Sequence, residues 1–275
     1  MNRMPARVLT IAGSDSGGGA GIQADLKTIT VLGGFGMSVI TALTAQNTLG
    51  VQGILEVPVS FIEQQFDAVA TDIGVDAAKT GMLVNSTILR AVAAKIRQYR
   101  IEKLVVDPVM TAKGGARLMG DDALESLIND LLPLAFVVTP NVPEAEVLSG
   151  IAINSKSDMR EAARKIRQMG VPNVVVKGGH LSGDACDILY DGQRYYEYSN
   201  MRIDTTDTHG TGCTYSAAIA TGLALGKTLP DALGEAKKYI QEVIRYAWRV
   251  GKGHGPTNHA APLLKDFHTK WDSKV

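Results

Sequence analysis

The residues best suited to chemistry in this 275-residue chain lie in the segment DTHGTGCT, Asp207–Thr214, which leads into a helical pattern. Gly210 and Gly212 let the backbone turn so that successive N–H groups face one point. The helix that follows adds the positive end of its dipole. The segment therefore predicts an anion site, which suits the γ-phosphate of a nucleotide and the charge that develops on it during transfer.

Cys213 stands in the first turn of the expected helix, beside this anion site. Because the helix dipole favours a thiolate, we expect a lowered pKa for the Cys213 thiol and an ability to take a proton from an attacking hydroxyl group. The alternative is a small buried side chain, the commoner role of a cytosolic cysteine. The other cysteine, Cys186, falls in an expected edge hairpin and is interpreted as structural.

Two other glycine-rich segments resemble nucleotide-binding motifs. Gly19–Ala24 (GAGIQA) matches the dinucleotide fingerprint, but the acidic residue expected about 20 positions later is missing around Thr44. Gly222–Thr228 (GLALGKT) resembles a P-loop, yet it has one residue too few between its glycines and follows a helix. We favour neither motif and interpret Gly226 as a helix C-cap.

Short apolar runs alternate with amphipathic segments along the whole chain. The first six runs are mostly continuous, which is typical of parallel strands buried on both faces, and Asp191-Gly192 joins the last two in a hairpin. The pattern predicts an α/β protein: one three-layer domain over residues 1–275, with a largely parallel sheet and a short antiparallel edge. The expected strands are Val8–Ala12, Ser38–Ala42, Ala78–Met82, Lys103–Asp107, Phe136–Thr139, Asn173–Lys177, Asp187–Tyr190 and Arg194–Tyr198. The expected helices are Gly21–Leu32, Ser60–Ile73, Ser86–Arg100, Asp122–Leu132, Ser157–Met169, Thr214–Gly226 and Pro230–Val250.

Polar residues follow the expected strands at their carboxyl ends, where open parallel sheets bind ligands. Gln46 follows the second strand, Asp107 ends the fourth, Glu144 follows the fifth and Lys177 ends the sixth. Any one of these could be an ordinary polar loop residue. Together they predict one site along this rim of the sheet.

The amino-acid composition bears on which binding partners and which cellular location we expect. The 28 basic and 28 acidic residues leave no net charge, which gives no support for binding nucleic acid or an anionic membrane. A chain with only two cysteines fits a reducing compartment. The first apolar run is too short for a signal peptide, and no stretch reaches the roughly 20 apolar residues of a membrane span. We therefore expect a cytoplasmic location.

Eight motifs occur in a specific order over nearly the whole chain: GSDSGGGAGIQADLKT, SVITALTAQNT, KTGML, VVDPVM, TPNVPEAE, VKGGH, DTHGTGCT and GHGPTNH. In this order they resemble the hydroxymethylpyrimidine/phosphomethylpyrimidine kinases of thiamine biosynthesis, in the ribokinase-like superfamily. The resemblance implies the three-layer αβα fold of that superfamily, a homodimer, and two successive phosphorylations that use ATP and Mg²⁺. The first acts on the 5-hydroxymethyl group of the aminopyrimidine, and the second converts the monophosphate to the diphosphate.

The resemblance also implies residue roles. Gln46 would hydrogen-bond the pyrimidine, since a carboxamide offers a donor and an acceptor together. Asp107 and Glu144 would organise Mg²⁺ directly or through water. Lys177 would meet the ATP phosphates and act in catalysis with Cys213, Gly210 and Gly212. The rest of the pyrimidine pocket would comprise Gly13, Ala20, Asp25, Met82 and Val109, and the nucleotide phosphates would meet Thr208, Gly210, Thr211 and Gly212.

One departure leaves the general base open. The wider superfamily usually has Gly-Thr-Gly-Asp at this turn, with the Asp as base, and this chain has Cys213 in that place. Either the thiolate serves, or another group or water does and Cys213 only shapes the site. Thr111–Met119 is interpreted as a flap over the substrate or, alternatively, as an ordinary loop.

Two other functions remain as alternatives. Pyridoxal kinases share the superfamily, and one branch resembles this chain but uses a second cysteine in the flap, where Met110–Met119 (MTAKGGARLM) has none. A non-catalytic nucleotide-binding regulator would be expected to lose one of Asp107, Glu144 and Lys177, and all three are present.

Overall fold

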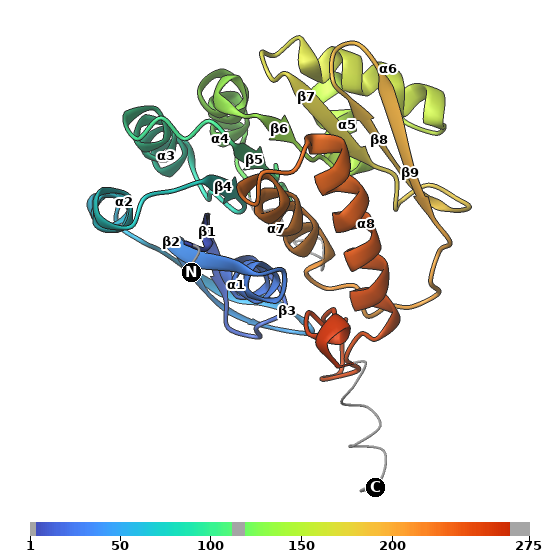
Figure 1. Ribbon diagram of the computed structural model, residues 1–275, viewed down its shortest axis with the longest axis horizontal. Coiled ribbons are helices and arrows are strands. Elements are labelled where there is room, and N and C mark those ends of the chain that lie inside the picture. The colour runs from blue at the N-terminus through green and yellow to red at the C-terminus, as the bar shows by residue number, and fades with distance from the viewer. Residues whose placement is uncertain (1–3, 112–118, 265–275) are drawn as a thin grey trace, which may run out of the picture.

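The computed structural model describes residues 4–111 and 119–264, whose strands form one sheet in the order β3-β2-β1-β4-β5-β6-β7-β8-β9 (Figure 1). The neighbours from β2 through β1 to β7 are parallel, while β3, β8 and β9 are antiparallel to their partners. The mostly parallel sheet with an antiparallel edge is therefore confirmed. The strands are β1 (Ala6–Asp15), β2 (Gly34–Asn47), β3 (Gly50–Glu56), β4 (Ala77–Thr80), β5 (Leu104–Val106), β6 (Val137–Val138), β7 (Asn173–Lys177), β8 (Ala185–Tyr190) and β9 (Tyr195–Asn200).

The edge formed by β3 was not expected. β2 runs from Gly34 to Asn47, well beyond the predicted Ser38–Ala42, and its second half pairs with β3. β3 contains two glycines and is half-buried to exposed, so it lacks the buried apolar run that marks a central strand. At the opposite edge, β8 and β9 turn at Asp191-Gly192 as expected, with Gly192 at a φ of 92°.

Helices cover both faces of the sheet and make three layers. On one face, Val8 of β1 and Val105 of β5 pack against α7 and α8, while Leu9 and Val106 point to the opposite face and its helices. This alternation gives two apolar cores, one on each side of the sheet. The helices are α1 (Gly21–Val31), α2 (Val59–Asp72), α3 (Ser86–Gln98), α4 (Asp121–Ser126), α5 (Val142–Ser149), α6 (Lys156–Arg167), α7 (Thr211–Ala224) and α8 (Leu229–Arg245).

Polar side chains cap two of the expected helices, and the segment after Gly120 departs from its expected form. Asn85 caps α3 and Ser155 caps α6, each accepting a hydrogen bond from a backbone N–H. The segment expected as the helix Asp122–Leu132 is α4 followed by a π-helical turn (Leu127–Leu131) and a 3₁₀ turn (Leu132–Leu134). Gly226 has a positive φ after α7, as expected of a helix C-cap, and Gly170 has one after α6.

The chain after α8 folds back onto the DTHGTGCT turn. α8 ends at Arg245 rather than Val250, and the later glycine-rich segment reaches His209, whose N–H donates to the Gly255 carbonyl. The Thr257 N–H in turn donates to the His209 carbonyl. Among the helices that the structure describes, none is long and apolar enough to cross a membrane.

Candidate active site

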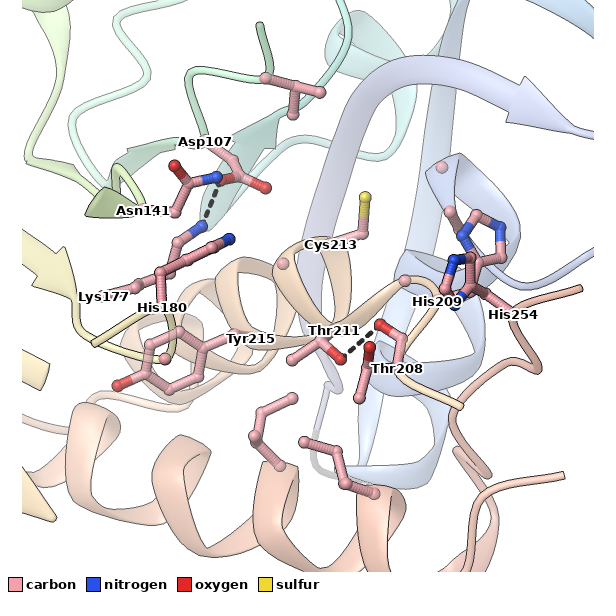
Figure 2. A pocket seen from close by; sticks show the side chains of 18 of the residues that line it. Asp107, Asn141, Lys177, His180, Thr208, His209, Thr211, Cys213, Tyr215 and His254 are labelled. Atoms are coloured by element: carbon pink, nitrogen blue, oxygen red, sulfur yellow. Dashed lines mark hydrogen bonds and ion pairs between the residues drawn. The ribbon is translucent and has the colours of Figure 1, made fainter. Parts of the chain in front are cut away.

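One cavity of about 780 Å³ opens along the carboxyl ends of the strands (Figure 2). Gln46 and Lys177, from distant strands, line the same cavity as the turn at residues 210–213. The sequence therefore brings the predicted groups to one place, with Asp25 as the exception. The predicted residues that line it are Gly13, Ala20, Gln46, Met82, Asp107, Val109, Glu144, Lys177, Thr208, Gly210, Thr211, Gly212 and Cys213.

The N-terminus of α7 borders this cavity. Gly210 is its N-cap and has a φ of 82°, a left-handed conformation that favours glycine, and a side chain there would strike the Gly19 carbonyl. The Thr211 hydroxyl turns back and donates to the Thr208 carbonyl at 2.7 Å. No side chain caps α7, so its first turn offers backbone N–H groups and the positive end of the helix dipole to a ligand.

Lys177 and Asp107 form an ion pair on the cavity wall, with Nζ 2.9 Å from Oδ1 (Figure 2). Burial disfavours the charge of Lys177, but Asp107 and Glu144 outweigh it and raise its pKa. The ammonium is therefore charged at neutral pH. The Ser216 and Thr139 hydroxyls lie 3.4 Å from the two carboxylate oxygens of Asp107, on the edge of hydrogen-bonding distance.

Glu144 reaches the site from α5, a helix that the sequence did not predict. Asn141 and Glu144 form a capping box: the Asn141 N–H donates to Glu144 Oε2 at 2.8 Å, and the Glu144 N–H donates to Asn141 Oδ1 at 3.0 Å. Burial raises the pKa of Glu144 to about 7, against the opposing charge of Lys177 and with a further contribution from Asp107. The signal that could have found α5 is Asn-x-x-Glu with Pro inside the first turn, a helix start signal.

The donor set fits a magnesium ion that is held mainly by substrate. Over residues 4–111 and 119–264 there is no cluster of three or more His, Cys, Asp or Glu side chains that could form a metal cage. Mg²⁺ usually takes one or two carboxylates and completes its shell with waters and phosphate oxygens. Asp107 and Glu144 supply two carboxylates, of which Asp107 contributes to the raised pKa of Glu144, and a cation would relieve this repulsion.

The pKa prediction for Cys213 was wrong in direction. Cys213 borders the cavity, but burial raises the pKa of its thiol to about 11, and the opposing charge of Lys79 is the smaller effect. A helix dipole contributes only about half a charge at its end, and here desolvation of a thiolate outweighs it. The thiol therefore keeps its proton at neutral pH in the ligand-free protein.

Asp25 does not line the cavity, contrary to its predicted place in the pyrimidine pocket. It is fully buried, with Lys79 Nζ at 3.0 and 2.9 Å from its two oxygens and the Thr10 hydroxyl at 2.6 Å. Its place in the pocket was implied only by the family resemblance. The structure instead makes it the partner of a buried lysine beneath the site.

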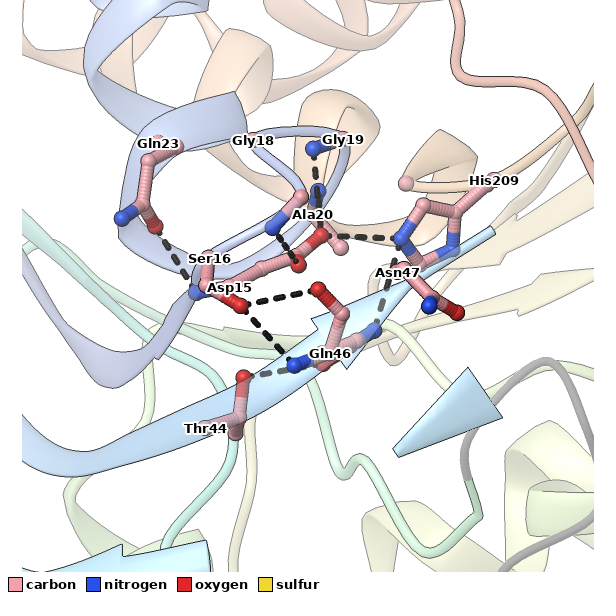
Figure 3. Close-up of polar contacts among 12 residues, drawn as sticks. Asp15, Ser16, Gly18, Gly19, Ala20, Gln23, Thr44, Gln46, Asn47 and His209 are labelled. Atoms are coloured by element: carbon pink, nitrogen blue, oxygen red, sulfur yellow. Dashed lines mark hydrogen bonds and ion pairs between the residues drawn. The ribbon is translucent and has the colours of Figure 1, made fainter. Parts of the chain in front are cut away.

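Asp15 is a site residue that the sequence analysis missed. It ends β1, and its carboxylate accepts hydrogen bonds from the N–H groups of Gly17, Gly19 and Ala20 at 2.8, 3.1 and 2.8 Å (Figure 3). His209 Nε2 lies 2.9 Å from Asp15 Oδ2. These three loop amides are thus bound by a carboxylate of the same chain. An Asp directly before Ser-Gly-Gly-Gly is a signal for such a turn.

The flap predicted at Thr111–Met119 lies almost wholly outside the described residues, since 112–118 are not among them. Thr111 lines the cavity at the start of this segment.

A mostly parallel sheet between helical layers, with an uncapped helix N-terminus, a lysine and two carboxylates at its carboxyl rim, defines a ribokinase-like small-molecule phosphotransferase. Residues 15–258 match the model of the phosphomethylpyrimidine kinase family, and the chain belongs to this family.

Curated relatives agree with this assignment. The hydroxymethylpyrimidine/phosphomethylpyrimidine kinase of Bacillus subtilis is 48% identical over 265 residues, which cover 96% of this chain and 98% of that protein. The thiamine biosynthesis bifunctional protein ThiED of Geobacter sulfurreducens is 56% identical over 262 residues, 94% of this chain. The present chain spans only 54% of the length of that protein.

Solved structures of two kinds resemble the chain. The phosphomethylpyrimidine kinase of Clostridium difficile has a TM-score of 0.78 at 45% identity and covers 86% of this chain and 99% of its own. The ADP complex of Bacillus subtilis pyridoxal kinase has a TM-score of 0.89 at 39% identity. The match covers 95% of this chain and 100% of that protein chain. The Staphylococcus aureus pyridoxal kinase, in complex with AMP-PCP and pyridoxal, has a TM-score of 0.88 at 36% identity. The match covers 94% of this chain and 95% of that protein chain.

Proposed function

We propose that this chain transfers the γ-phosphoryl group of ATP to the 5-hydroxymethyl group of an aminopyrimidine and then phosphorylates the monophosphate to the diphosphate, in thiamine biosynthesis. The observation that carries the proposal is that Gln46, Lys177 and the anion-binding turn line one cavity. Family membership and the names of the relatives support the same substrate. The ADP and AMP-PCP complexes of the structurally similar pyridoxal kinases support ATP as the donor.

In this proposal the pyrimidine lies at the β1–β2 side of the cavity. Gln46 hydrogen-bonds the ring, and Gly13, Ala20, Met82 and Val109 shape the space around it. The Cβ of a side chain at position 13 would collide with the end of Met82, so glycine leaves room for that side chain beside the substrate. Asp25 contributes from below, through its pair with Lys79.

The nucleotide phosphates would lie against the N-terminus of α7. Thr208, Gly210, Thr211 and Gly212 provide the turn, and its N–H groups stabilise the charge that develops on the transferred group. Lys177 adds a positive charge beside this turn, since a Cβ at Gly212 would lie 3.6 Å from its Nζ. Mg²⁺, held by Asp107 and Glu144 directly or through water, would neutralise phosphate charge when bound.

Cys213 stands where a base would receive the hydroxyl proton, and the chemistry requires its thiolate. Since the thiol pKa is about 11, only a small fraction is ionised at neutral pH. We propose that Cys213 acts through this fraction, which makes the rate of transfer depend on pH.

A pyridoxal kinase is the second candidate, because the pyridoxal kinases of B. subtilis and S. aureus have TM-scores of 0.89 and 0.88 to this chain. ATP consumption with hydroxymethylpyrimidine and with pyridoxal separates the two. We expect kcat/KM to be at least tenfold higher for the pyrimidine. A preference for pyridoxal would reverse the assignment, and no turnover with either would support the non-catalytic nucleotide-binding regulator.

A homodimer in the cytoplasm completes the proposal. Leu43 of β2 and Leu55 of β3 are 44% and 66% exposed and directly paired, so they form one apolar surface on the edge of the sheet. Light scattering of Leu55→Glu against the unchanged chain tests this surface. We expect the dimer mass to fall to that of the monomer, while a dimeric variant would remove this surface from the interface.

A further inference from the structure

Gln46 stands between two polar partners that decide which way its carboxamide faces. Its Nε2 lies 3.5 Å from His209 Nε2, and its Oε1 lies 3.2 Å from Thr44 Oγ1 (Figure 3). The oxygen and nitrogen of a carboxamide have nearly the same shape. Their places are therefore assigned from the hydrogen bonds that each position allows.

The His209 side of the carboxamide must be an acceptor. His209 Nε2 lies 2.9 Å from Asp15 Oδ2, and the Asp15 carboxylate is ionised because His209 and the loop amides lower its pKa against the effect of burial. An ionised carboxylate only accepts, so His209 Nε2 carries a hydrogen whether the ring is neutral or charged. An N–H of Gln46 cannot bond to that nitrogen, whereas Oε1 in the same place can share its hydrogen.

The Thr44 side independently requires a donor. The Thr44 hydroxyl gives its hydrogen to the Ser14 carbonyl at 2.8 Å, which leaves only lone pairs for Gln46. A carboxamide oxygen facing that hydroxyl finds no hydrogen to accept, whereas an N–H facing it donates a hydrogen bond to the hydroxyl oxygen. Both neighbours thus select the same orientation, with Oε1 toward His209 and Nε2 toward Thr44.

The His209 ring is itself fixed in place. A side chain at Gly19 would collide with the ring, so the glycine loop and the ring lie in direct contact. Backbone hydrogen bonds to the segment after α8 hold both the N–H and the carbonyl of His209. Asp15, with three amides and the ring on its carboxylate, is 3% exposed and cannot move away without losing these bonds.

We propose that Asp15 and His209 are positioning residues that fix the sense of the Gln46 carboxamide and so determine which ring edge the pocket accepts. The fixed amide presents its N–H on the Thr44 side and its oxygen on the His209 side. Its complement is an amidine-like edge, in which a ring nitrogen accepts and a neighbouring amino group donates. The inference rests on the proposed function, because it assumes that Gln46 contacts the substrate ring.

The hydrogen on His209 can be measured without any substrate. Long-range ¹H–¹⁵N spectra of the ligand-free protein, with the His209 signals assigned by comparison with His209→Gln, report which ring nitrogen is protonated. We expect a protonated Nε2. A ring protonated at Nδ1 alone would overturn the proposal, whatever the activity of the enzyme.

Kinetics test the effect on specificity. The substrates are hydroxymethylpyrimidine and an analogue that lacks the amino group. We expect the unchanged chain to prefer the amino compound by about 10²-fold in kcat/KM, and His209→Phe to reduce this preference to under tenfold with the KM for ATP within about twofold. His209→Gln, which restores a donor toward Asp15, should recover the preference. A His209→Phe enzyme with undiminished preference would overturn the proposal.

A second variant covers the case in which His209→Phe does not fold. Thr44→Val removes the acceptor on the other side of the carboxamide and should likewise weaken the preference at least fivefold. Thr71→Val is the matched control, because its hydroxyl bonds a carbonyl on the exposed surface of α2, away from the cavity. An equal effect of both Thr→Val changes would refute the role of Thr44.

If the unchanged chain does not phosphorylate the pyrimidine, the proposed function fails. The His209 spectrum still decides whether His209 positions the Gln46 carboxamide.

Discussion

Lys79 Nζ lies 2.9 and 3.0 Å from the two carboxylate oxygens of Asp25, and both side chains are fully buried. Burial opposes the charge of Lys79, but the charges of Asp25 and Asp107 and the hydrogen bond to Asp25 outweigh it and raise its pKa. Lys79 therefore keeps its charge at neutral pH as one half of a buried ion pair. This pair links β4 to α1 under the floor of the active site.

Lys79→Met should destabilise the protein by about 3–5 kcal/mol, because it leaves Asp25 buried with only the Thr10 hydroxyl as a side-chain partner. Urea unfolding at pH 7 measures the loss. The double variant Lys79→Met with Asp25→Leu removes both charges and should recover most of it. A loss below about 1 kcal/mol in the single variant would mean that the pair is not needed for stability.

Gln46→Leu should raise the KM for the pyrimidine at least tenfold, since a substrate edge that donates and accepts would lose its partner. Nucleotide affinity, measured by calorimetry with AMP-PCP, should stay within about twofold because the nucleotide phosphates are expected at the turn before α7. An unchanged KM would remove Gln46 from the pyrimidine pocket.

Cys213→Ala should lower kcat by about 10²-fold or more if the thiolate is the base. Because the raised pKa of about 11 leaves the thiol protonated at pH 7, kcat of the unchanged enzyme should rise with pH by close to tenfold per unit between about 7 and 9. The variant should lose this slope. A flat profile together with a loss under tenfold would assign Cys213 to packing.

Glu144→Gln should stabilise the ligand-free protein at pH 8 while lowering its activity. Burial raises the folded-state pKa of Glu144 from 4.5 to about 7, so the stability it contributes is complete below pH 4.5 and is lost as pH rises through 7. Removing the ionised carboxylate should gain roughly 1–3 kcal/mol at pH 8 and nothing at pH 4. Equal effects at both pH values in urea unfolding would show that the gain has another origin.

The sheet and the residues that line the cavity at its rim could be predicted because their signals are local. Continuous apolar runs such as that of β7 mark parallel strands, and the rule that ligands bind at carboxyl ends then places Lys177 and Asp107 together. β3 escaped prediction because it is held by pairing with β2 rather than by burial of its own side chains. Edge strands of this kind lack a strong sequence pattern.

Electrostatic details of the site depend on groups that are distant in sequence. Asp25 and Lys79 are separated by 54 positions, and no spacing rule connects them. The same holds for Asp15 and His209, which are 194 positions apart. The pKa of the Cys213 thiol was predicted from the dipole of the helix that carries it. Burial of the thiol by the surrounding protein instead decides the direction of the shift.

The Asp15 carboxylate accepts hydrogen bonds from the N–H groups of the glycine-rich loop, and this affects how substrates bind beside the loop. A loop that is already closed on its own carboxylate is preorganised, so capturing a ligand requires little loss of backbone entropy there. Encounter with the pyrimidine should then proceed in a single kinetic phase, with no slow rearrangement of this segment, and inorganic phosphate should not compete for it.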